Sequence, residues 1–175
     1  AGTYRLGKDR EEGNAPHTVR LDPYFMDRDE VTNERYRKCV ADRKCAKSRV
    51  AKDNRFNGLR QPVVGIRFKD APAFCRRDAG KRLPTPDEWE AAARSAEANT
   101  FPWGDRWAPR RANVAGREDG HAQTANVGSF RTGNTLAGLR DMAGNAAEFV
   151  SNSGKSGRAR GGSYQSPGEK TVSAM

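Results

Sequence analysis

The chain has 175 residues and a formal net charge of +10, and only 35% of its residues are hydrophobic, against about 45–50% in an average soluble domain. This length fits a single domain over residues 1–175, and the 18 glycines and 9 prolines indicate a loop-rich one. The charge attracts anionic partners or simply solubilises the surface, but aromatic residues do not interleave with the basic clusters, so nucleic-acid binding is not expected. No stretch approaches the ~20 apolar residues of a membrane span.

The first third of the chain predicts a strand pair followed by a helix. Residues 1–26 read as extended, and His17-Thr-Val-Arg-Leu21 alternates between polar and apolar residues. Thr32 then suits the N-cap of a helix, because Tyr36, Cys39 and Val40 follow at the spacing of one apolar face.

Two further helices are predicted over residues 69–79 and from Thr85 onward. The first has Pro72 in its first turn and Gly80 as its stop. In the second, Thr85-Pro-Asp-Glu88 forms a capping box, which assigns Glu88 to capping. Its buried stripe is predicted to be Trp89, Ala92 and Ala93.

Residues 99–137 show neither helical nor strand periodicity, and a loop of that length in a compact domain needs something to hold it. The segment Gly138–Phe149 sets the carboxylates of Asp141 and Glu148 around a Gly-Asn turn that exposes carbonyl oxygens. Ca²⁺ prefers such all-oxygen ligands, although the same residues also suit a polar surface turn. Residues 151–157 predict a surface loop.

Several ordered motifs carry a resemblance to a known family. They are Asp29-Glu-Val-Thr-Asn33, Gly80-Lys-Arg-Leu-Pro-Thr-Pro-Asp-Glu-Trp-Glu-Ala-Ala-Ala-Arg94, Phe101-Pro-Trp-Gly-Asp105, Ala112-Asn-Val114, Val127-Gly-Ser-Phe130, the Gly138–Phe149 segment and Arg160-Gly-Gly-Ser-Tyr164. Together they resemble the formylglycine-generating enzyme family, also called the sulfatase-modifying factor family. The resemblance implies an α+β fold, a variant of the C-type lectin fold that is loop-rich, with few helices and short antiparallel strands.

The resemblance also implies two calcium sites. In the first, Asn113 and Asp119 would donate side-chain oxygens, while Val114 and His121 would donate backbone carbonyls and the His121 ring would be incidental. In the second, Asp141 and Glu148 would donate carboxylates and Gly144 and Ala146 would donate carbonyls.

The catalytic chemistry of the family is not expected on this chain. The family's enzymes oxidise a cysteine with copper(I) held by two cysteines after the motif that matches Arg160–Tyr164, and no cysteine follows Tyr164 here. Ala147 also replaces an aromatic residue of the family pattern. We therefore expect no copper and a non-catalytic, calcium-stabilised, lectin-like binding or assembly module. The alternative is a copper-dependent formylglycine-generating oxidase whose cysteine pair lies beyond residue 175.

The expected ligand is a protein or a glycan, and the net charge of +10 would suit an anionic one. Its surface is predicted where the second calcium loop meets the Arg-Gly-Gly-Ser strand, at Asn145, Arg160, Ser163 and Tyr164. The alternative is that these residues only pack the core.

The resemblance implies a Cys39–Cys45 disulfide in members that live outside the cytoplasm and leaves Cys75 as a small hydrophobic residue. This favours an extracytoplasmic location, periplasmic or secreted, without excluding the cytoplasm. Family domains continue with further strands after Tyr164. The resemblance therefore implies a domain that lacks its C-terminal strands, either because this is a truncated piece or because another segment or chain supplies them.

Overall fold

The computed structural model describes residues 1–7, 14–151 and 157–168. This part of the chain is α+β and loop-rich, as predicted, with two separate two-stranded antiparallel sheets. Among these residues no helix has the length and apolar character that crossing a bilayer requires. The regular elements are β1 (Gly2–Leu6), β2 (His17–Leu21), α1 (Asn33–Ala41), α2 (Asp70–Arg77), α3 (Pro86–Arg94), the 3-10 helix η1 (Arg131–Gly133), β3 (Glu148–Val150) and β4 (Arg158–Arg160).

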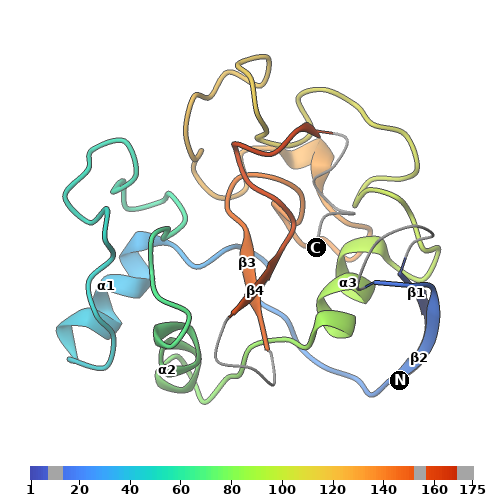
Figure 1. Ribbon diagram of the computed structural model, residues 1–175, viewed down its shortest axis with the longest axis horizontal. Coiled ribbons are helices and arrows are strands. Elements are labelled where there is room, and N and C mark those ends of the chain that lie inside the picture. The colour runs from blue at the N-terminus through green and yellow to red at the C-terminus, as the bar shows by residue number, and fades with distance from the viewer. Residues whose placement is uncertain (8–13, 152–156, 169–175) are drawn as a thin grey trace.

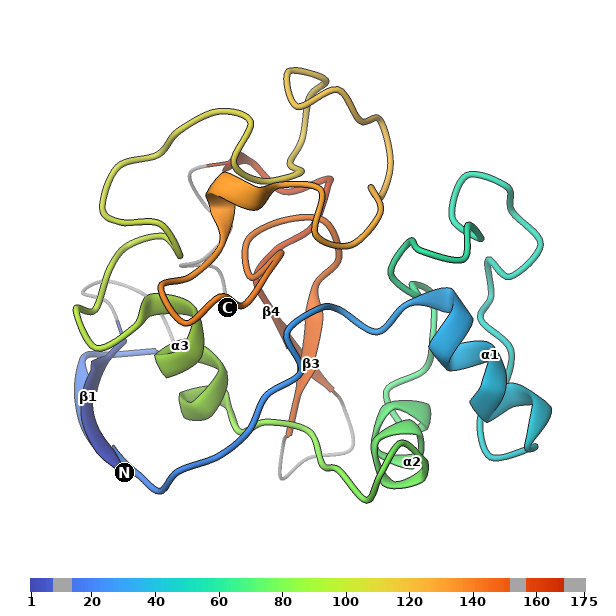
Figure 2. The same ribbon diagram turned by 180° about the vertical axis from the view of Figure 1, so that it is seen from behind.

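The β3–β4 pair lies in the middle of the molecule, between two groups of elements (Figure 1). Helices α1 and α2 lie on one side of it, whereas α3 and the β1–β2 hairpin lie on the other (Figures 1 and 2). The long segment between α3 and β3 forms the loops that rise above α3 and the central strands in both views (Figures 1 and 2). Each side of the molecule has its own hydrophobic core.

The strand pair predicted for the first residues is confirmed. Gly2 pairs with Leu21 and Leu6 pairs with His17, which fixes the register of the β1–β2 hairpin. Leu6 at the end of β1 is 1% exposed, so the hairpin anchors to the core through this end.

The α1–α2 side contains the smaller core. The Thr32 side chain accepts a hydrogen bond from Arg35 N–H and caps α1, as predicted. A disulfide joins Cys39 in α1 to Cys45 just past the end of the helix, and this bridge packs with Tyr36 and Phe74. The disulfide implied by the resemblance is therefore present, and Cys75 is a free, partly buried thiol against the same core.

Helix α3 carries the larger core. Its capping box is present in both directions, since Thr85 Oγ1 accepts from Glu88 N–H and Glu88 Oε2 accepts from Thr85 N–H. Trp89 and Ala93 are fully buried and pack with residues from the long loops and from β3. The predicted stripe is correct for these two residues, but Ala92 is only partly buried.

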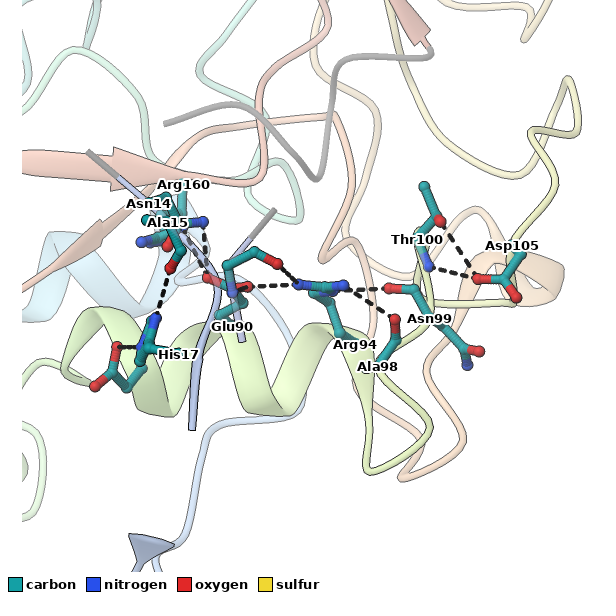
Figure 3. Close-up of polar contacts among 12 residues, drawn as sticks. Asn14, Ala15, His17, Glu90, Arg94, Ala98, Asn99, Thr100, Asp105 and Arg160 are labelled. Carbon is teal, nitrogen blue, oxygen red and sulfur yellow. Dashed lines mark hydrogen bonds and ion pairs between the residues drawn. The ribbon is translucent and has the colours of Figure 1, made fainter. Parts of the chain in front are cut away.

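Glu90 in α3 is also buried, at 2% exposure, although the sequence pattern did not place it in the core. Its Oε1 accepts from Gly7 N–H and from Arg94, both at 2.7 Å. Its Oε2 accepts from Asn14 Nδ2 at 3.1 Å and from Arg160 at 3.3 Å (Figure 3). One carboxylate therefore ties the end of β1, α3 and the end of β4 together.

The segment predicted as an Arg-Gly-Gly-Ser strand is a strand only as far as Arg160. Gly161 and Gly162 have φ angles of 88° and 69°, which turn the chain out of the ladder. A Cβ atom at Gly161 would lie 3.0 Å from the Trp89 ring, so the tight turn also needs the absence of a side chain. Of the predicted 151–157 loop, residues 152–156 lie outside the described residues.

Candidate functional site

The first predicted calcium loop, residues 113–121, is closed by Asp119. The Asp119 carboxylate accepts from Val114 N–H at 2.9 Å and from His121 N–H at 2.8 Å. This carboxylate therefore draws the backbone on both sides of the loop together. The His121 ring packs edge-on against Phe130, and the residue's one oxygen, its backbone carbonyl, is the atom predicted to bind the ion.

Asn113 provides an unpaired oxygen in this loop. The residue is 0% exposed, and its Nδ2 donates to Gln123 O at 2.9 Å. Its Oδ1 has no hydrogen-bond partner among the described residues. An unsatisfied buried acceptor costs about 1–3 kcal/mol, and a cation bound to that oxygen would remove the cost. The donor set of this loop, an amide oxygen and a carboxylate with carbonyls nearby, therefore fits a hard cation.

The second predicted loop turns sharply at residues that adopt left-handed backbone. Asp141, Gly144 and Asn145 have φ angles of 56°, 78° and 56°. Gly144 is required on steric grounds as well, because a Cβ atom there would lie 2.1 Å from Asn113 O. The first and second loops are thus in direct backbone contact, and Asn113 and Gly144 form a parallel bridge.

The carboxylates of the second loop are enclosed. Asp141 Oδ2 accepts from Gly128 N–H at 2.5 Å, and Glu148 Oε2 accepts from Trp89 Nε1 at 2.6 Å. Burial raises the pKa of Asp141. Burial also raises the pKa of Glu148 to about 7, against the Trp89 hydrogen bond and with help from the Asp141 charge. A positive ion near both groups would stabilise their charged forms.

Glu30 joins this pair, and sequence reasoning missed it. Its Oε2 accepts from Asn145 Nδ2 at 2.6 Å, and its Oε1 accepts from Ala146 N–H at 2.9 Å. Burial, and then the charges of Asp141 and Glu148, raise the pKa of Glu30 well above its usual value. The one available signal was a glutamate inside the Asp29–Asn33 motif, just before the Thr32 cap.

These carboxylates do not form a ready-made carboxylate cage. Within the described ranges, no three His, Cys, Asp or Glu side chains are grouped so that they could hold one ion. A cation at either loop would therefore need carbonyl and amide oxygens in addition, which is the mixed donor set predicted for both sites.

A cavity of about 1060 Å³ opens beside the second loop. Three of the four predicted ligand-binding residues line it, namely Asn145, Ser163 and Tyr164, together with the predicted calcium ligands Ala146 and Glu148. The rest of the lining includes residues 23–27, 29–31, 62–66 and 80–84 and part of α2. We call this space the groove. The loop and the Arg-Gly-Gly-Ser segment meet as predicted, because Gly144 N–H donates to Gly161 O and Tyr164 N–H donates to Asn145 O.

The lining surface of the groove is mostly apolar, and it also includes charged side chains such as Glu30, Lys81 and Glu88. Ala147 lines the groove at a position where the family pattern has an aromatic residue, so no large ring fills the groove at this position. The Tyr164 ring leans on Phe56 at 5.9 Å between centroids. Apolar lining residues include Phe25, Met26, Val31, Val63, Ile66 and Phe149.

The fourth predicted ligand-binding residue, Arg160, is placed differently. It is 3% exposed, it is absent from the groove lining, and its Nη1 lies 3.3 Å from Glu90 Oε2. The side chain therefore packs in the core in this structure, and its contact with a ligand stays a prediction.

The cysteines offer one free thiol for nucleophilic or metal-binding chemistry. Of the chain's three cysteines, Cys39 and Cys45 are bonded to each other. Cys75 lines the groove, and burial raises the pKa of its thiol, which makes it a poor nucleophile and a poor soft-metal ligand.

Residues 1–174 match the family described as "Sulfatase-modifying factor enzyme 1-like domain". Among similar proteins, "Inactive C-alpha-formylglycine-generating enzyme 2" of Bos taurus is 37% identical over 107 residues, covering 54% of this chain and 35% of that protein. "Formylglycine-generating enzyme" of Streptomyces coelicolor is 42% identical over 102 residues, covering 51% of this chain and 32% of that protein. The chain thus spans about a third of the length of these relatives.

Solved structures share the fold, for example the following two. "Treponema denticola variable protein 1" has a TM-score of 0.76 at 20% identity, covering 100% of this chain and 85% of that chain. CarF has a TM-score of 0.67 at 22% identity, covering 99% of this chain and 89% of that chain. At these identities the likeness concerns the fold alone, and it confirms the predicted loop-rich α+β fold of the formylglycine-generating-enzyme type.

Proposed function

We propose that this chain, which belongs to the sulfatase-modifying factor (formylglycine-generating enzyme) family, is a non-catalytic, calcium-stabilised, lectin-like binding or assembly module. The observation that carries the proposal is the groove, because Asn145, Ser163 and Tyr164 line it beside the second calcium loop. The proposed function requires loops that calcium would order and a groove open to a ligand, and the placement of the second loop beside the groove supports it.

The chemistry of both loops supports calcium. Asn113, Val114, Asp119 and His121 would hold the first ion, and Asp141, Gly144, Ala146 and Glu148 the second. The orphaned Asn113 Oδ1 supports a hard cation at the first loop. At the second loop, burial raises the pKa of Asp141 and Glu148, and a bound cation would offset that cost by stabilising their charged forms. When bound, calcium supplies a fixed charge that orders the loops between α3 and β3.

The cysteines support the absence of oxidase chemistry on this chain. A copper(I) site of the family type needs two converging thiolates, whereas here the bonded pair is next to α1 and Cys75 stands alone at the groove. The Bos taurus relative named as inactive supports the same conclusion. We therefore propose that copper is not bound.

The ligand we propose is a protein or a glycan, and the net charge of +10 favours an anionic one. The Cys39–Cys45 disulfide supports an extracytoplasmic location, because such bonds persist in oxidising compartments.

The experiment is a binding screen on arrays of extended peptides and of glycans, run with calcium and with chelator. We expect calcium-dependent binding that Tyr164→Ala abolishes, and we expect Tyr4→Ala in β1 to leave it unchanged because Tyr4 is not part of the groove. Binding that ignores both calcium and Tyr164, or oxidation of a cysteine peptide by residues 1–175 with Cu(I) and oxygen, would contradict the proposal.

The second candidate is the copper-dependent oxidase with a cysteine pair beyond residue 175. The 42% identity to the Streptomyces coelicolor enzyme favours it. Peptide oxidation by a longer chain, but not by residues 1–175, would establish this alternative.

A further inference from the structure

Asn145 lies where the first calcium loop and the second calcium loop touch. Its backbone N–H donates to Asn113 O at 2.8 Å, and its Oδ1 accepts from Asn113 Nδ2 at 2.9 Å. The same Oδ1 accepts from Ala125 N–H at 2.8 Å. Asn113 and Asn145 are 0% and 1% exposed, so this amide pair is shielded from water and its hydrogen bonds are strong.

The other groups of Asn145 reach the second loop's acid and the groove. Its Nδ2 donates to Glu30 Oε2, and Glu30 Oε1 in turn holds Ala146 N–H. Its carbonyl accepts from Tyr164 N–H at 3.0 Å. A single side chain and its peptide group therefore join both calcium loops to a residue that lines the groove.

The orientation of the Asn113 amide is decisive in this arrangement. Its Nδ2 bonds to Gln123 O and Asn145 Oδ1, while its Oδ1 has no partner among the described residues. A cation on Oδ1 would fix the amide in the orientation that also holds Asn145. Once Asn145 is fixed, its neighbour Ala146, a proposed ligand of the second site, and its partner Tyr164 are held in position. The ion at the first loop would do this without touching either residue.

We propose that Asn145 is a positioning residue that couples the two calcium loops to each other and to the groove, so that calcium at the Asn113 loop strengthens calcium binding at the Asp141 loop and orders Tyr164. This rests on the proposed calcium sites. Coupling between sites of this kind typically amounts to about 5–150-fold in affinity, and the strengthening is reciprocal.

The test is a calorimetric calcium titration of chelator-treated protein. Asn145→Gly removes the amide while keeping a residue that tolerates the φ of 56°. Asn113→Asp keeps an oxygen for the first ion but removes the donor to Asn145. Asn126→Gly, at an exposed asparagine in the loop between the two sites, is the matched control. Circular dichroism at saturating calcium verifies that each variant is folded.

We expect two ions to bind the wild-type chain and the control with about tenfold positive coupling. Asn145→Gly and Asn113→Asp should each bind two ions without coupling between the sites. In these variants, the binding of the peptide or glycan that depends on Tyr164 should require calcium at the second site only. Two independent ions in the wild type, or unchanged coupling in folded Asn113→Asp, would overturn the coupling and leave the calcium proposal standing. No calcium binding by the wild type would overturn both.

Discussion

Replacing Glu90 by Gln tests how the core is held together. Among the described residues, Glu90 Oε1 accepts from Gly7 and Arg94 and its Oε2 accepts from Asn14 and Arg160. Figure 3 shows the contacts with the three side chains. Whichever way the glutamine amide is oriented, its NH₂ group would face two of these donors. The change would also leave the Arg160 guanidinium, whose side chain is 4% exposed, without its counter-charge.

Removing one partner of a buried ion pair costs about 3–5 kcal/mol. For a chain of this length each kcal/mol lowers Tm by roughly 2–4 °C, so Glu90→Gln should lower Tm by roughly 10 °C. Urea and thermal denaturation measure it, with Glu97→Gln as the control because Glu97 is an exposed glutamate just beyond α3. A second variant, Glu90→Gln with Arg160→Met, should regain part of the loss. A Glu90→Gln stability within 1 kcal/mol of wild type would refute the reasoning.

The remaining predictions concern acid, the helix cap and the cysteines. Burial raises the pKa of Glu90, but the hydrogen bonds from Gly7 N–H, Arg94 and Asn14 and the charge of Arg160 outweigh it, so the net pKa lies below the usual 4.5. Its stabilisation is then complete above pH 4.5 and is lost as the pH falls through the folded pKa, and the gap between wild type and Glu90→Gln should close in acid denaturation curves; a gap constant down to pH 2 would contradict this. Thr85→Ala should cost about 1 kcal/mol of unfolding free energy by removing the cap of α3, with Thr132→Ala as an exposed control, and equal losses would speak against the capping role. Non-reducing peptide mapping should show Cys39 joined to Cys45 and Cys75 free, and three alkylated thiols in native protein would disprove the bridge.

Local signals predicted the regular elements well. Three of these signals each depend on only a few neighbouring residues: the α3 capping box, the Thr32 cap and the alternation of His17–Leu21. The structure contains both caps and the strand. The end of β4 was missed because the resemblance extended the strand over two glycines that in fact turn the chain.

The positions of three side chains could not be predicted, because they depend on contacts between residues far apart in the sequence. Glu90 reads as a surface residue in its helix, and it is buried because its partners Gly7 and Arg160 are 83 and 70 residues away. Glu30 was overlooked for the same reason, since Asn145 and Ala146 are 115 and 116 residues from it. Arg160 was predicted at the ligand surface because its segment should meet the second loop, and no local feature reveals that its guanidinium pairs with Glu90.

The most direct test of the account is a thermal melt of residues 1–175 in calcium and in chelator, combined with elemental analysis of the metal bound. The account predicts two calcium ions per chain and a higher midpoint in calcium, with about 2.7 kcal/mol per site at a hundredfold excess over Kd. An unchanged midpoint together with no bound calcium would contradict the proposal that calcium orders the loops beside the groove.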